Sequence, residues 1–246
     1  MATIAELARM SLDVYEADSS MSGAWSRVAP FGDSKAGFFA AVFRKGDEWC
    51  LAFRGTDDVL HDGLADLQIA LGKYPLQFLE AAMAYSSVRT VLQSHSVSRF
   101  LLTGHSLGGG LASLVGYRQG VRTVTFNAPG MARAEADRLL ADSPIGSVLA
   151  SVMRDAVSVA LDDDDAGARI TNIRAVHDPV SIGTGATLGS DLSIGNFCPS
   201  PSFSFGGVAS LLGQALGQGA AYLMCQHSMQ QLYWAIAADP RFHEEL

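Results

Sequence analysis

The chain has 246 residues, of which 48% are hydrophobic and 17% charged, so it can bury a full core. Its formal net charge of −8, without any cluster of Lys and Arg, disfavours nucleic acid as a partner. No long Pro/Ser-rich or charge-rich linker divides it, and we therefore expect a single domain over residues 1–246.

Residues 1–18 alternate apolar and acidic side chains and predict an amphipathic helix. They lack the basic start and the apolar block of a signal peptide. We therefore expect either a cytoplasmic protein or export by a route other than Sec.

Short apolar runs then alternate with helical stripes along the chain. Two neighbouring strands are predicted at 38–43 and 49–53, joined by a polar turn, and a helix follows at 78–92. The remaining predicted elements are a strand around 100–102, a helix after it, a strand at 121–126, helices at 133–140 and 148–160, and a strand at 170–176. This alternation predicts an α/β fold with a mostly parallel central sheet and helices on both faces.

The string FLLTGHSLGGGLASL at 100–114 leads an apolar strand into a Gly-x-Ser-x-Gly turn and then into a helix. Gly104 and Gly108 permit a sharp turn that holds the Ser106 hydroxyl clear of its own backbone. The helix that follows directs its free N–H groups toward the place where an oxyanion forms. Ser106 is therefore the candidate nucleophile of an α/β-hydrolase fold, and the alternative is a Gly-rich loop whose serine has no function.

A serine nucleophile needs a histidine base and an acid, which follow it in that fold in the order acid, then histidine. Asp178 comes directly after the predicted strand at 170–176 and would lie beside the turn, unless it merely caps a turn before Pro179. His227, at the start of an apolar helical stretch, is the candidate base.

The other histidines fit the role of base less well. His243 lies in the charged last few residues, where chain ends fray, while His177 and His95 precede the acid. We expect His105 to point away from the turn and to serve in packing or hydrogen bonding.

At the string CLAFRGTDDVLHDGLADLQIAL, residues 50–71, the chain is similar to a known family. Together with TGHSLGGGLA and TFNAPG, this string resembles the class 3 lipases, which include fungal triacylglycerol lipases. The resemblance runs from about residue 38 to His227. It implies an α/β-hydrolase fold and the cleavage of acyl esters.

The resemblance also implies an oxyanion hole made by Thr56 and by the N–H of Leu107. A loop that leaves the neighbouring strand can aim Thr56 at the same charge as Leu107, which agrees with this implication. In the family an aspartate beyond the loop orients the hydroxyl, and Asp66 occupies that place, although it can equally be a solvated residue at a helix start. The sequence departs from the family at KYPLQF, residues 73–78, and at Gly63, which leaves the lid and the acyl pocket open.

Three cysteines, Cys50, Cys198 and Cys225, show no metal spacing and no dense disulfide pattern, so we expect reduced thiols. Four consecutive aspartates at 162–165 do not match a calcium loop and are interpreted as a solvated turn. Neither a metal nor an organic cofactor is called for.

Residues 192–238 contain no Asp, Glu, Lys or Arg. An apolar helical stripe within them has two interpretations: core packing, or a flap within 192–226 that meets acyl chains or a lipid surface. A membrane span is disfavoured because several Gly and Gln residues interrupt the stripe. The stripe consists of Leu211, Leu212, Ala215, Leu216, Tyr222 and Leu223.

These patterns together predict a serine carboxylester hydrolase that cleaves acyl esters of lipids through an acyl-enzyme. Its partners would be the lipid or acyl ester and, transiently, a lipid surface, and the sequence leaves the oligomeric state open. Four alternatives stay open: a phospholipase A acting at sn-1 or sn-2, an esterase for soluble esters, an acyltransferase, and a non-catalytic binding module on a hydrolase scaffold.

Overall fold

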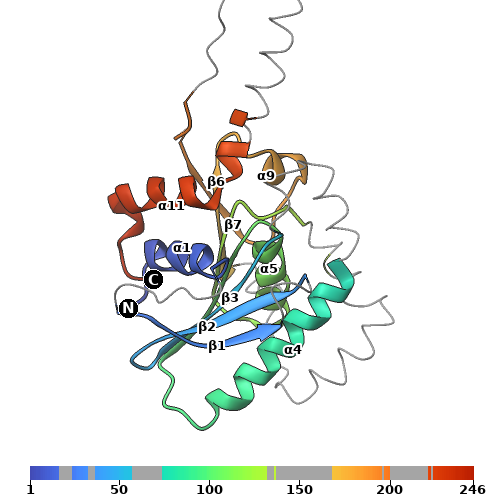
Figure 1. Ribbon diagram of the computed structural model, residues 1–246, viewed down its shortest axis with the longest axis vertical. Helices are drawn as coiled ribbons and strands as arrows, with labels where there is room; N and C mark the ends of the chain where they lie inside the picture. The colour runs from blue at the N-terminus through green and yellow to red at the C-terminus, as the bar shows by residue number, and fades with distance from the viewer. Residues whose placement is uncertain are drawn as a thin grey trace, which may run out of the picture.

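The computed structural model describes residues 1–16, 24–32, 37–56, 74–131, 136, 168–195, 197–199, 221–222 and 224–246. These residues form a seven-stranded sheet in which the strands lie side by side in chain order (Figure 1). The strands are β1 (Ser26–Gly32), β2 (Phe39–Lys45), β3 (Glu48–Phe53), β4 (Arg99–His105), β5 (Thr123–Phe126), β6 (Ile170–Ala175) and β7 (Ser190–Ile194). The pairs β1–β2 and β2–β3 are antiparallel, and the four pairs from β3 to β7 are parallel. The predicted mostly parallel sheet is confirmed, but β1 and β7 were not predicted.

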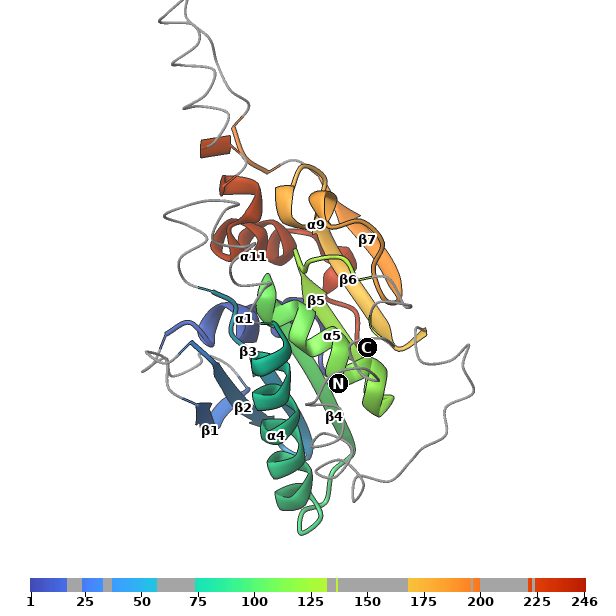
Figure 2. The same ribbon diagram turned by 90° about the vertical axis from the view of Figure 1, so that its right-hand side faces the viewer.

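Helices cover both faces of the sheet, as an α/β chain requires. Helices α4 and α5 lie side by side on one face, and α1 and α11 pack together on the other (Figures 1 and 2). The helices are α1 (Ile4–Asp13), α4 (Tyr74–Leu92), α5 (Leu107–Gln119), α9 (Pro179–Gly183) and α11 (Met229–Ala238), followed by the 3₁₀ turn η1 (Pro240–Phe242).

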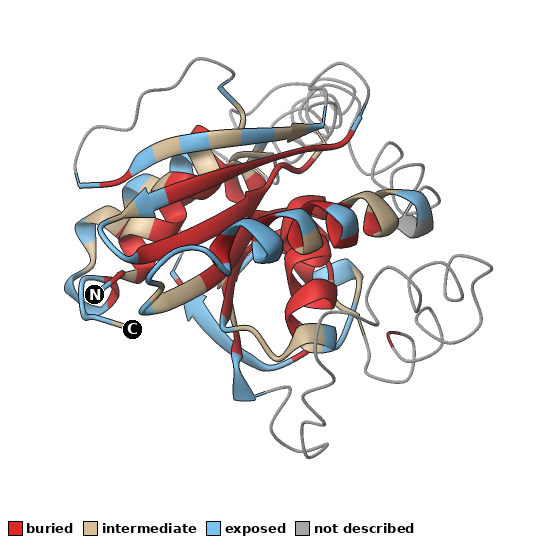
Figure 3. Ribbon diagram, turned by 90° about the horizontal axis from the view of Figure 1, so that it is seen from below, coloured by how far each residue is buried: buried red, intermediate tan, exposed pale blue. Residues whose placement is uncertain are grey.

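The two faces of the sheet bury separate hydrophobic clusters. In β2, Ala40 and Val42 face the cluster formed with α4 and α5, whereas Phe39, Ala41 and Phe43 face the cluster with α1 and α11. This strand therefore has no polar face, and Figure 3 shows the central strands buried along most of their length. Burying one large apolar side chain contributes about 1.5–3 kcal/mol, so the two clusters hold the strands firmly in register.

Helix α1 begins where the sequence supplies a cap. The Thr3 hydroxyl accepts from the N–H of Glu6, and the Glu6 carboxylate accepts from the N–H of Thr3, which together form a capping box. The predicted amphipathic helix in residues 1–18 is confirmed over the range of α1. Its apolar side chains contact α11, whose buried Leu232 and Ile236 belong to the apolar stripe expected after His227.

Several sequence expectations concern other parts of the chain. The expected helices at 133–140 and 148–160 lie outside the described residues except for Ala136, as do the four aspartates at 162–165. Among the helices that the structure describes, none has both the length and the apolar composition for crossing a bilayer.

Candidate functional site

Ser106 lies in a sharp turn between β4 and α5. Its φ of 53° falls in the left-handed region, which non-glycine residues seldom occupy. The Ser106 N–H donates to the Phe126 carbonyl oxygen at 3.0 Å, while its own carbonyl accepts from Gly110 N–H at 3.1 Å as α5 begins. The backbone is therefore held in the strained conformation typical of a nucleophile elbow.

The glycines of the motif are required by close backbone contacts. A Cβ atom at Gly104 would lie 2.5 Å from the backbone carbonyl carbon of Gly108, and a Cβ atom at Gly108 would overlap the carbonyl oxygen of Phe53. Helix α5 therefore approaches β4 and β3 so closely that no side chain fits between them. The predicted turn is confirmed together with its physical reason.

The structure brings Ser106, His227 and Asp178 together. Nδ1 of His227 lies 2.6 Å from Oδ1 of Asp178, and Nε2 lies 2.9 Å from the Ser106 hydroxyl oxygen. Because a carboxylate only accepts, Nδ1 carries a proton, and Nε2 is the ring nitrogen that faces the serine hydroxyl. All three residues are buried, with exposed fractions of 0 to 2%. This arrangement can take a proton from the serine hydroxyl and stabilise the resulting imidazolium.

Asp178 has two roles in the structure. It is the N-cap of α9, where its Oδ2 accepts from Ser181 N–H at 2.7 Å, and its Oδ1 faces His227. Burial alone would raise the pKa of the Asp178 carboxyl, but the hydrogen bonds from His227 and Ser181 outweigh it and hold the pKa below its ordinary value. The carboxyl is therefore ionised at neutral pH. The two interpretations offered by the sequence, turn cap and acid, are compatible.

The expected oxyanion-hole residues flank the serine. Leu107 is the first residue of α5, directly after Ser106. Thr56 is half-buried and follows Gly55, where a Cβ atom would lie 3.3 Å from the Cβ of Ser106. The loop after β3 therefore passes close to the nucleophile. Asp66, the expected orienting residue, lies outside the described residues.

His105 contacts the base, as expected of a buried hydrogen-bonding residue. Its Nε2 lies 2.7 Å from the carbonyl oxygen of His227, and its Nδ1 lies 3.1 Å from the hydroxyl of Tyr15. Burial, followed by the neighbouring His227, lowers the pKa of His105 to about 3. Sequence reasoning did not single out Tyr15 or Asn127. The sequence signal at Asn127 is a polar residue directly after the predicted strand at 121–126, and the structure adds a φ of 44° there.

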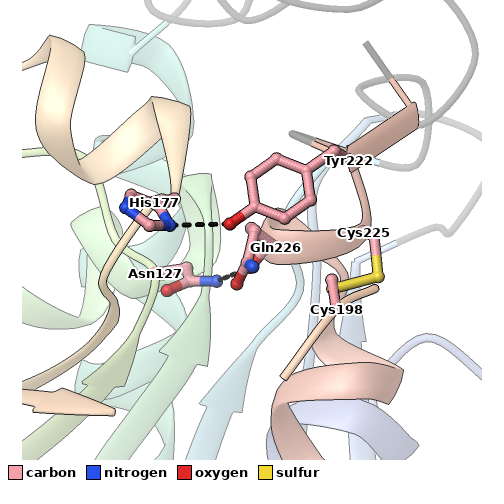
Figure 4. Close-up of a disulfide and its surroundings, with 6 residues drawn as sticks. All are labelled: Asn127, His177, Cys198, Tyr222, Cys225 and Gln226. Atoms are coloured by element: carbon pink, nitrogen blue, oxygen red, sulfur yellow. Dashed lines mark hydrogen bonds between the residues drawn. A yellow bond between two sulfur atoms is a disulfide. The ribbon is translucent and has the colours of Figure 1, made fainter. Parts of the chain in front are cut away.

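The loop that carries Asp178 and the segment that carries His227 are joined by a second hydrogen bond. His177, next to the acid, forms a 2.7 Å hydrogen bond between its Nδ1 and the hydroxyl of Tyr222 (Figure 4). Tyr222 is the one described member of the predicted apolar stripe, and the rest of that stripe, with most of the flap proposed within 192–226, lies outside the described residues.

Two of the three expected free thiols are paired. Cys198 and Cys225 form a disulfide two residues before His227, with 6.1 Å between their Cα atoms (Figure 4). The prediction of reduced thiols was wrong for this pair, because 27 residues separate the two in sequence and only the fold brings them together. Cys50 is free, as predicted, and it is buried. Within the described ranges, no three His, Cys, Asp or Glu side chains gather into a metal site.

The strand–turn–helix at Ser106 on a mostly parallel sheet, with an acid and a histidine following in that order, defines an α/β hydrolase. Residues 6–147 match the family model described as phospholipase-like, Tle-like phospholipase domain. The match spans more than half of the chain, and the chain belongs to this family.

Similar proteins are lipid ester hydrolases by name. The chain is 34% identical over 122 residues to an extracellular phospholipase A1 of Serratia liquefaciens, a stretch that covers 50% of this chain and 37% of that protein. The chain thus spans little more than a third of that relative. The resemblance to lipases expected from the sequence is confirmed by the family match and this relative.

Two solved lipase structures are also similar to this chain. A triacylglycerol lipase from Penicillium expansum aligns over 78% of this chain and 79% of its own, with 12% identity and a TM-score of 0.49. The Rhizomucor miehei lipase in complex with its propeptide aligns over 72% of this chain and 61% of its own, with 13% identity and a TM-score of 0.45.

Proposed function

We propose that the chain hydrolyses acyl esters of lipids through a covalent acyl-enzyme on Ser106. The observation that carries the proposal is the continuous hydrogen-bond chain from the Ser106 hydroxyl through His227 to Asp178, at 2.9 and 2.6 Å. A serine in a strained elbow, beside a histidine that a buried carboxylate orients, is the arrangement that activates a hydroxyl for attack on a carbonyl.

The reaction divides into two halves. Ser106 Oγ attacks the ester carbonyl carbon while its proton passes to Nε2 of His227, and Asp178 stabilises the imidazolium. The N–H groups of Thr56 and Leu107 hold the negative oxygen of the tetrahedral intermediate. When the ester C–O bond breaks, the leaving alcohol takes the proton from His227. Water, deprotonated by the same Nε2, then releases the fatty acid and restores Ser106.

A fluorophosphonate probe tests this assignment, because it forms an adduct only with an activated serine. We expect an adduct on Ser106 by peptide mass spectrometry, and hydrolysis of nitrophenyl esters that rises with acyl chain length. Ser106→Ala is expected to lose the adduct and nearly all hydrolysis, while Ser113→Ala, a change to a buried serine of the same helix, keeps both. Folded protein without an adduct would favour the binding module, and rates that do not rise with chain length would favour a soluble-ester esterase.

Phospholipids are the second candidate substrate, favoured over triacylglycerols by the phospholipase family and by the name of the Serratia relative. Vesicles of a phosphatidylcholine with different acyl chains at sn-1 and sn-2 distinguish the positions, and a triacylglycerol emulsion serves as competitor. We expect release of fatty acid from the phospholipid, and the identity of that acid gives the position. Preferential turnover of the emulsion would instead assign a triacylglycerol lipase.

A further inference from the structure

Two buried side chains hold consecutive backbone carbonyls of the segment that carries the base. Asn127 Nδ2 donates to the Gln226 carbonyl oxygen at 2.8 Å (Figure 4), and His105 Nε2 donates to the His227 carbonyl oxygen at 2.7 Å. His105 ends β4 and Asn127 follows β5, so the donors come from the carboxyl ends of two adjacent parallel strands. The backbone of 226 and 227 is thus fixed from the sheet at two successive peptide groups.

Asn127 also joins the base segment to the strand before the acid. Its Oδ1 accepts from the N–H of Ala175 at 2.8 Å, and its backbone N–H donates to Ile173 at 2.9 Å. The side-chain amide therefore faces a donor with its oxygen and an acceptor with its nitrogen, which leaves one orientation possible. Asn127 is fully buried, and its positive φ is a conformation that Asn tolerates better than most residues.

His105 extends the connection to the loop after β3. The His227 carbonyl only accepts, so Nε2 of His105 carries the proton, and its Nδ1 accepts from the hydroxyl of Tyr15 at 3.1 Å. The same hydroxyl accepts from the N–H of Gly55 at 3.1 Å, next to Thr56. The low pKa of His105 keeps its ring neutral at physiological pH, which preserves this direction of donation.

We propose that His105 and Asn127 are positioning residues, which hold the carbonyls of His227 and Gln226 and so keep the His227 imidazole between Ser106 and Asp178. The proposal rests on the proposed function, because it concerns the same three residues. The ring must meet two partners at once, at 2.9 and 2.6 Å, and a backbone shift of about 1 Å is enough to cost ~10²-fold in rate.

The test uses variants of the full chain with a short nitrophenyl ester. Asn127→Asp keeps the shape and the tolerance of positive φ but sets a carboxylate oxygen against the Gln226 carbonyl, and we expect kcat to fall ~10²-fold with KM nearly unchanged. Asn172→Asp is the matched control, because Asn172 is also buried but donates to the Leu188 carbonyl at 2.8 Å, away from the base. We expect it to lower Tm and leave kcat unchanged.

His105 is tested by a pair of variants. His105→Leu removes the donor to the His227 carbonyl, whereas His105→Gln places an amide N–H near the position of Nε2, so we expect a large loss of kcat in the first and partial recovery in the second. Tyr15→Phe removes only one hydroxyl and frees the ring of His105 to take the other tautomer. The same change removes the acceptor of Gly55 N–H. If the other variants do not fold, Tyr15→Phe is therefore judged by the proton resonance of His227 Nδ1–H, which we expect to shift, as well as by a fall in kcat.

A direct readout is the downfield proton resonance of His227 Nδ1–H. We expect it to shift or vanish in Asn127→Asp and His105→Leu and to persist in Asn172→Asp. Wild-type kcat in Asn127→Asp and His105→Leu overturns the proposal, as does an equal loss of kcat in Asn172→Asp. The Ser106→Ala variant distinguishes failure of the positioning proposal from failure of the proposed function. An inactive Ser106→Ala protein beside a fully active Asn127→Asp protein refutes only the positioning role. An active Ser106→Ala protein refutes the proposed function.

Discussion

Asp178 and His227 are joined by a 2.6 Å hydrogen bond between side chains that are both almost completely buried. Asp178→Asn would keep the shape of the acid but present an amide N–H to Nδ1 and so favour the wrong tautomer of the base. We expect kcat for a nitrophenyl ester to fall by about 10⁴-fold with little change in fold.

The matched control for this change is Asp239→Asn, which removes an equal charge at the cap of η1, away from the base. We expect its kcat to equal that of wild type. An active Asp178→Asn protein would show that His227 needs no acid.

Gly55 marks the closest approach of the loop after β3 to the nucleophile. A Cβ atom there would overlap the Tyr15 hydroxyl and lie 2.7 Å from the His105 carbonyl oxygen, so Gly55→Ala must displace the loop that carries Thr56. We expect kcat for hydrolysis of a nitrophenyl ester to fall ~10²-fold. Gly195→Ala, where a Cβ atom meets nothing within 4 Å, serves as the control, and equal rates in the two variants would contradict the packing argument.

The disulfide joins Cys198 to Cys225, which are 27 positions apart in sequence, and so closes a loop that ends just before His227. Replacing both cysteines by alanine is expected to lower the free energy of unfolding by roughly 3.5 kcal/mol, because the unfolded chain regains the entropy of the open loop. Urea titration measures this difference. Dithiothreitol should weaken the wild type to a similar extent and leave the double variant unchanged, and a wild type that is insensitive to reduction in its unfolded state would contradict the pairing.

His105 makes the fold sensitive to acid. Burial lowers its pKa from 6.5 to about 3, so below pH 6.5 the unfolded chain binds a proton that the folded protein excludes. The contribution of His105 to the free energy of unfolding is therefore fully present above pH 6.5. It is lost as the pH falls, by up to ~1.4 kcal/mol per pH unit. The Asp178 carboxyl, whose pKa is lowered on folding, stabilises the fold fully above its ordinary pKa of 3.8, so its contribution does not change between pH 7 and 4.5.

Urea unfolding across that range checks this prediction. His105→Gln is expected to give a flatter dependence of unfolding free energy on pH than wild type, even if it is less stable at pH 7. Parallel curves for the two proteins would show that another group causes the acid sensitivity.

The two strands that sequence reasoning missed are the edges of the sheet. β1 carries Pro30 and half-exposed side chains, and β7 is exposed at four of its five residues. Neither has the apolar run that revealed the central strands, since an edge strand is buried by fewer neighbours. The sheet interior was therefore predictable from hydrophobicity, and its borders were not.

The meeting of Ser106, Asp178 and His227 was predictable because chain order and strand ends restrict the candidate acid and base to few residues. Tyr15 and Asn127 escaped prediction because their hydrogen bonds join them to residues that are distant in sequence: Tyr15 to Gly55, and Asn127 to Gln226. The disulfide was missed for the same reason. Side-chain chemistry identifies reactive groups in a sequence, whereas the contacts that hold them in place exist only after folding.

The helix that follows His227, α11, packs against α1, which precedes Ser106 in the chain. Ser106 and His227 are 121 residues apart, so the base is synthesised on the order of ten seconds after the nucleophile. Until then a nascent chain carries Ser106 without the histidine that is proposed to accept its proton. Under the proposed function, a chain can hydrolyse esters only after His227 has been synthesised and α11 has packed against α1.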